Sequence, residues 1–329
     1  MRTFIFSILS ATLFVAGCGP QAILNPLAPR PQVDVSALEN KAVRIVRDGL
    51  SDEHGLARIH AVEVVATTER RDLMPKVLNL LADPYVAVRF AAAAAVGDMR
   101  YAAGEYSVKP MLQDPDPNVR IAAAYALARL GKSEHADLIR SAARDPDQTV
   151  RANAVLLLGK LGDKKNLPLL YEVLHDVQST DKVKFQAVDS IAMLKDEKIY
   201  KDRLWALLIG KFADDRVMGI YGMAALNTTE ARDAILTMLN DEVLEVRLCA
   251  AEQLGRIGDT SGEAEVIAFF EEIRPNLDET SAANTFAAMA VGRIGTEPLK
   301  KYLPELLQSD SKVVQLSGAQ STLLMAAAK

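Results

Sequence analysis

Apolar and polar positions follow the period of an α-helix along most of the chain, and the whole pattern recurs about every 31 residues. In the clearest units an Asp-Pro pair precedes an Arg, which is followed by an Ala-rich run. We take this Arg as the marker of a unit; its nine copies fall at Arg58, Arg89, Arg120, Arg151, Lys184, Met218, Arg247, Asn284 and Gln315. Strand-like alternation is absent. The pattern predicts an array of stacked helical elements.

Each marker lies in a helix with one strongly apolar face. Residues one before, three after and seven after the marker share that face, and in four units they read Val88, Ala92, Val96; Val119, Ala123, Leu127; Val150, Ala154, Leu158; and Val246, Ala250, Leu254. Asp, Ser or Thr stands at the expected helix start in six units, one of them Asp214. A glycine eleven residues after the marker fits a left-handed C-terminal cap at Gly131, Gly162, Gly258 and Gly295. A second amphipathic segment separates these helices, so each unit reads as helix–turn–helix.

The signature Asp-Pro-x-x-x-Val-Arg-x-x-Ala-x-x-x-Leu-Gly is matched in full or nearly so by residues 83–97, 114–128, 145–159 and 241–255. It resembles the HEAT-like repeat, in the short-period form found in phycobilin lyases. The resemblance implies an all-α fold, a right-handed α-solenoid of about nine helix–turn–helix repeats over residues 37–329. It is specific for fold and weak for activity, because such arrays include both scaffolds and enzymes.

The N-terminus predicts an address in the cell envelope. The positively charged Arg2 is followed by a short apolar stretch, which ends in Val15-Ala16-Gly17-Cys18. This arrangement resembles a bacterial lipoprotein signal. The resemblance implies a signal peptide over residues 1–17, acyl chains on Cys18, and attachment to the outer membrane facing the periplasm. Residues 18–36 hold four prolines and predict an extended tether. The alternative is an ordinary secretory signal that contains a cysteine.

Asp and Arg recur together in the turns. The Asp six residues before the marker is expected to pair with an Arg of its own or of a neighbouring unit. We call these residues the structural ladder: Asp83, Arg89, Asp114, Arg120, Asp145, Arg151, Asp241 and Arg247. The alternative interpretation, acid–base machinery, is the weaker one because the pattern repeats in every clear unit.

The sequence offers little catalytic chemistry. Four histidines are spread over three units without metal-ligand spacing, and the His-Glu pairs of the similarly built deoxyhypusine hydroxylases are missing. We expect no catalytic residue, no metal and no cofactor, and no small-molecule substrate is evident. Cys249 occupies a slot filled by small residues in sister units. A formal net charge of −5 argues against nucleic-acid binding.

Residues two, five and nine after the marker point away from the packed face and are expected to line the concave side. This stripe reads polar in the first units (His60, Glu63) and apolar further on, at Ile220, Met223 and Cys249. As partner-binding residues we select Tyr125, Arg129, Asn153, Lys160, Phe286 and Met289. Solvated or neighbour-packed side chains are the alternative explanation.

These observations favour a lipid-anchored scaffold that binds a protein partner through its concave face and has no catalysis of its own. The alternative is an enzyme or enzyme subunit related to bilin lyases or to metal-dependent HEAT-repeat hydroxylases. Bilin lyases act in the cytoplasm, which an exported lipoprotein would leave. The sequence does not name the partner.

Overall fold

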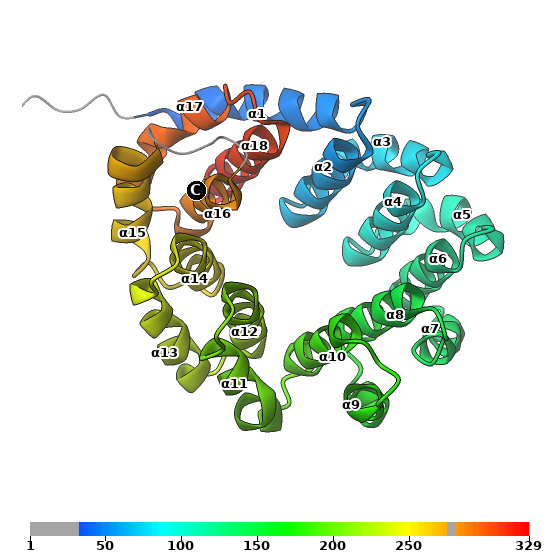
Figure 1. Ribbon diagram of the computed structural model, residues 1–329. Helices are drawn as coiled ribbons and strands as arrows, with labels where there is room; N and C mark the ends of the chain where they lie inside the picture. The colour runs from blue at the N-terminus through cyan, green and yellow to red at the C-terminus, as the bar shows by residue number, and fades with distance from the viewer. Residues whose placement is uncertain (1–32, 275–280, 329) are drawn as a thin grey trace, which may run out of the picture. The chain divides into compact units, whose positions relative to one another are not determined.

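The computed structural model describes residues 33–274 and 281–328; the expected signal peptide, Cys18 and most of the tether lie outside them. The described residues form eighteen α-helices and no β-strand, which confirms the all-α solenoid. The helices alternate between two layers (Figure 1). The outer layer holds α1 Val35–Gly49, α3 Met74–Asn79, α5 Glu105–Val108, α7 Ala136–Ala142, α9 Leu167–His175, α11 Trp205–Leu208, α13 Thr229–Thr237, α15 Glu263–Ala268 and α17 Leu303–Leu306.

The inner layer carries the markers. It holds α2 Gly55–Thr67, α4 Val86–Asp98, α6 Pro117–Arg129, α8 Gln148–Leu161, α10 Asp181–Met193, α12 Ala213–Leu226, α14 Leu244–Arg256, α16 Ala282–Ile294 and α18 Lys312–Ala327. The predicted packing face is confirmed, because all twelve residues named for it above are buried. Short 3₁₀ turns connect most outer helices to their neighbours. The first helix begins at Val35, two residues before the expected start of the solenoid.

The predicted C-terminal caps are confirmed, and the predicted N-terminal caps are confirmed in part. Gly131, Gly162, Gly258 and Gly295 have φ of 97°, 76°, 86° and 69°, the left-handed region that a side chain disfavours. Asp116 and Asp147 accept from backbone N–H groups in the first turns of α6 and α8. Where the start residue lacks such an oxygen, as at Tyr85, the turn Asp two residues earlier accepts from its backbone N–H instead.

The sixth unit is displaced by two residues from the expected register. Arg216, and not Met218, occupies the marker position. Its guanidinium donates to the carbonyl oxygen of Gly210 at 3.0 Å and to the carboxylate of Asp241 at 2.8 Å. Arg89 makes the same two kinds of contact in its own unit. The marker at Met218 was therefore wrong, and Asp214 lies inside the first turn of α12 rather than at its start.

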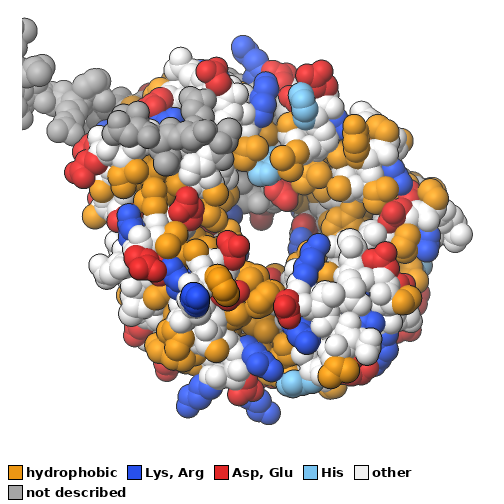
Figure 2. Space-filling model, viewed as in Figure 1, with side chains coloured by type: hydrophobic (Ala, Val, Ile, Leu, Met, Phe, Trp, Pro, Cys, Tyr) orange, Lys and Arg blue, Asp and Glu red, His pale blue; other side chains and the backbone are white. Residues whose placement is uncertain are grey.

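The last unit packs against the first. Helix α18 contacts both α1 and α2, and Leu316 and Leu323 of α18 share one hydrophobic core with Ala42 and Val46 of α1. The unit formed by residues 33–328 is thus a closed ring of nine repeats around a central opening (Figures 1 and 2). Closure turns the concave face into the wall of that opening.

Candidate functional site

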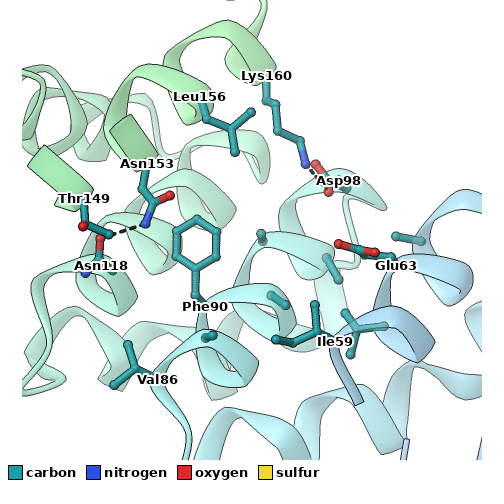
Figure 3. Close-up of a pocket in the computed structure, with 16 residues that line it drawn as sticks. Ile59, Glu63, Val86, Phe90, Asp98, Asn118, Thr149, Asn153, Leu156 and Lys160 are labelled. Carbon is teal, nitrogen blue, oxygen red and sulfur yellow. Dashed lines mark hydrogen bonds and ion pairs between the residues drawn. The ribbon is translucent and has the colours of Figure 1, made fainter. Parts of the chain in front are cut away.

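A pocket of about 460 Å³ opens on the inner surface between α2, α4 and α8 (Figure 3). Ile59, Val86, Phe90 and Leu156 line it with apolar side chains. Helix α6 lies behind the pocket, because Asn118 is its only residue in the lining. We call this the inner pocket.

One rim of the inner pocket is an ionic bridge between helices that are not neighbours. Lys160 Nζ on α8 donates to Asp98 Oδ2 on α4 at 2.6 Å, across α6 (Figure 3). The other carboxylate oxygen of Asp98 accepts from the hydroxyl of Tyr125, also at 2.6 Å. Burial and the neighbouring Asp98 charge both raise the pKa of Tyr125, which therefore stays a hydrogen-bond donor.

The opposite rim is neutral and polar. Asn153 Nδ2 donates to Asn118 Oδ1 at 2.9 Å, and Thr149 lies beside them (Figure 3). The inner pocket thus combines an apolar floor with one charged and one amide rim. This is the composition of surfaces that bind an apolar group and fix its orientation through a few polar contacts.

The structural ladder joins several units to their neighbours, and its clearest pairs lie at the start of the ring. Arg89 donates to both carboxylate oxygens of Asp114 at 2.9 and 3.0 Å, and Arg58 pairs with Asp83 in the same way. The arginine's remaining donor binds the backbone carbonyl of the Asp in its own unit, at 2.9 Å between Arg89 and Asp83. The sequence left open whether each Asp pairs with an Arg of its own unit or of a neighbouring one. The structure contains both: a side-chain ion pair between units, and a hydrogen bond from the Arg to the backbone carbonyl of the Asp within one unit.

The ladder varies where the turns vary. Arg151 pairs with Asp176, and Arg247 with Glu265, each at 2.7 Å. Arg120 donates to the backbone carbonyls of Asp114 and Pro115, and no ion pair joins it to Asp145 within the described ranges. Asp145 instead accepts from the backbone N–H of Asp147.

The six predicted partner-binding residues do not share one surface. Asn153 and Lys160 line the inner pocket. Tyr125 is only 1% exposed, so a bound partner could not contact it in this conformation. Arg129 is half-buried, with its guanidinium near the carbonyls of Gly97 and Lys160. Phe286 and Met289 are half-buried on α16, on the far side of the ring. A role in binding stays a prediction for all six.

The expected apolar stripe is wrong at three of its residues, whereas Phe286 and Met289 keep partial exposure. Ile220, Met223 and Cys249 are completely buried. The first two were misplaced by the two-residue register error. Cys249 is covered by the close packing of its helix; burial raises its thiol pKa, which keeps the group protonated.

Two of the later inner helices, α14 and α16, bury charge between them. Gly255 and Gly292 let α14, α16 and α18 approach so closely that a Cβ at either position would lie under 3 Å from the next helix. Glu252 is consequently 3% exposed, 3.6 Å from the Arg293 guanidinium. Burial raises the pKa of Glu252.

Sequence reasoning missed the large apolar residues of the inner pocket. Ile59 and Phe90 each follow a marker directly, a position outside both the packed face and the expected stripe. The available signal was Phe90, an aromatic side chain at a repeat position where sister units carry Ile121, Ala152 and Leu248.

No group of three or more His, Cys, Asp or Glu side chains in the described chain is placed to hold a metal ion. Among the same residues, no helix combines the length and the hydrophobicity needed to cross a membrane.

Comparison with known proteins identifies the repeat. A family model described as HEAT repeats matches residues 106–192, and a second, described as HEAT repeat, matches residues 73–99 and 232–261. No curated protein sequence matches the chain.

Several solved structures are similar to the chain at low sequence identity. The CpcE–CpcF complex of phycocyanin lyase from Nostoc sp. PCC7120 is 18% identical with a TM-score of 0.43, covering 77% of this chain and 94% of that one. Human deoxyhypusine hydroxylase is 15% identical with a TM-score of 0.39, covering 79% and 97%. Importin beta is 16% identical with a TM-score of 0.35, covering 86% and 46%.

Proposed function

Because the chain is a HEAT-like repeat protein, we propose that it is a lipid-anchored interaction module of the bacterial cell envelope. It holds a protein partner on the inner surface of its ring and catalyses no reaction itself. The observation that carries this proposal is the inner pocket, with its apolar floor and polar rims facing the central opening.

The inner pocket has the features of a binding hot spot. Phe90 is half-buried and stands on a floor of small and aliphatic residues, so a partner's apolar side chain would bury it fully. The Asp98–Lys160 bridge and the Asn118–Asn153 pair surround that floor with groups able to bind a peptide backbone. Because this surface lies on the inner side of a ring with a central opening (Figure 2), we expect the partner to contribute a segment and not a flat face.

The partner proposal is tested by capture from native membranes. The double substitution Phe90→Ser/Leu156→Ser should remove the captured protein, because it takes two apolar side chains from the inner pocket. The matched control is Tyr106→Ser/Leu138→Ser, at two exposed apolar positions in the outer layer. Equal capture by both variants, with unchanged helicity, would overturn the proposal.

The proposed attachment to the membrane is tested separately. Anchoring through Cys18 predicts that labelled palmitate enters the wild-type protein, and that Cys18→Ser moves the protein from membranes to the soluble fraction. A wild-type protein that fractionates as soluble and unlabelled would show that the anchor is wrong.

A further inference from the structure

Three adjacent pockets lie in series along α10, where it meets α9, α11 and α12, and we call them together the furrow. The first, of about 420 Å³, lies beside the first turns of α10 and beside α11. The second, of about 460 Å³, shares Phe185, Val188 and Leu207 with the first. The third, also about 460 Å³, shares Asp189 and Tyr221 with the second. The furrow therefore follows α10 from its first turn to its last.

The first pocket carries cations that the protein itself does not neutralise. Lys184 and Arg203 both line it, and within the part of the chain described neither side chain forms an ion pair or a hydrogen bond. Asp181 is the only carboxylate in its lining, and His175 completes its titratable groups. The net charge of this pocket is thus positive in a chain whose formal net charge is −5.

The second pocket is mostly apolar, although Lys182, Gln186 and Asp189 also line it. Phe185, Leu207 and Met218 are half-buried there, and Val188 is 4% exposed. These four side chains come from α10, α11 and α12, so the apolar surface bridges the seam between two repeats. Figure 2 shows hydrophobic side chains on the lower wall of the opening, with charged ones around them.

We propose that this furrow binds a small amphiphile with one anionic head, a carboxylate or a phosphate, and one unbranched apolar chain. The head lies between Lys184 and Arg203, and the chain lies along Phe185, Val188, Leu207 and Met218.

Size and charge together select this class of ligand. Small-molecule pockets are typically about 300–1,000 Å³, mostly apolar, with a few placed polar groups. The two free cations favour an anion, and the start of α10 adds the positive end of a helix dipole on the same side. The furrow shares no lining residue with the inner pocket, so its ligand is independent of the proposed protein partner.

The chain contains a built-in reporter for this site. Trp205 is its only tryptophan, 44% exposed, and next to Ala206 and Leu207, which line the furrow. Laurate and dodecyl phosphate are each titrated into the full-length protein, at ligand concentrations below those at which micelles form. Each should give a saturable change in the fluorescence of Trp205. Dodecanol should bind about tenfold more weakly, and dodecyltrimethylammonium should not compete. Equal binding of all four probes, or none with either anion, would overturn the proposal.

Substitutions locate both ends of the ligand. Lys184→Gln/Arg203→Gln should weaken laurate binding about tenfold or more, while Lys164→Gln/Lys165→Gln, which removes the same charge outside the furrow, should leave it unchanged. Met218→Asp should abolish binding by placing a carboxylate in the apolar stretch, with isothermal calorimetry as the second readout. An equal loss of laurate affinity in the Lys184→Gln/Arg203→Gln variant and in the Lys164→Gln/Lys165→Gln variant would contradict a specific site for the head group.

Discussion

Lys160 on α8 forms an ion pair with Asp98 on α4, across the intervening helix α6, with 2.6 Å between Nζ and Oδ2. The contact ties the second repeat of the ring to the fourth and skips the third, which carries α6. Because the same carboxylate also accepts from the buried Tyr125 hydroxyl, Asp98 holds three consecutive inner helices in register.

This double role predicts unequal costs for the two partners. Asp98→Ala should lower the free energy of unfolding by about 2 kcal/mol, because it leaves the buried Tyr125 hydroxyl without its acceptor. Lys160→Ala should cost less than about 1 kcal/mol, since its side chain is 31% exposed. Denaturant unfolding checks both values; equal costs would show that the Tyr125 bond contributes nothing.

The structural ladder predicts that substitutions of its arginines lower the free energy of unfolding by different amounts. Arg58→Ala should cost about 3 kcal/mol, because it strands the Asp83 carboxylate, whose side chain is 5% exposed. Arg120→Ala should cost about 1 kcal/mol, because its guanidinium donates to backbone carbonyls. Thermal melts of the two variants, measured side by side, should preserve this order. The reverse order would mean that the inter-repeat pair is not the stabilising contact.

Ring closure depends on a glycine at the junction of the first and last repeats. A Cβ on Gly49 would lie 3.0 Å from both Leu316 and Ala61. Gly49→Leu should therefore separate α1 from α18 and raise the radius of gyration in small-angle scattering. Gly55→Ala is the control in the same repeat, since the nearest atoms to its Cβ are 3.5 Å away. An unchanged radius for Gly49→Leu would argue against closure in solution.

Asp189 predicts a pH-dependent stability. Burial raises its pKa above the ordinary 3.8, against the lowering effects of Arg256 and of the Gln186 amide. A carboxyl with a raised pKa binds its proton more tightly in the folded state, so the stability it contributes is lost as pH rises from 3.8 through the folded value. Asp189→Asn should accordingly raise the melting temperature at pH 7, and the gain should disappear below pH 3.8. A lower melting temperature at pH 7 would contradict the account.

The repeat made the layers of the fold predictable from the sequence. Val88, Ala92 and Val96 recur at a fixed phase because each unit buries the same face, and local spacing is enough to see this. Closure was not predictable in the same way. The contact between Gly49 and Leu316 results from small rotations accumulated over all nine repeats, which no single unit encodes.

The candidate site was predicted only where the register held. Asn153 and Lys160 line the inner pocket as their phase indicated, whereas Ile220 and Met223 are buried because Arg216 starts its unit two residues early. Tyr125 has the right phase but lies behind the Asp98–Lys160 bridge. That bridge joins residues 62 apart, a separation that repeat spacing alone does not predict.

The central claim is that a protein partner occupies the inner surface of the ring, and site-specific photo-crosslinking in native membranes tests it most directly. A photoreactive amino acid at Leu156, in the inner pocket, should give a discrete adduct with one protein. The same group at Tyr106, 91% exposed in the outer layer, should give none. An adduct from position 106 with none from position 156 would contradict the account.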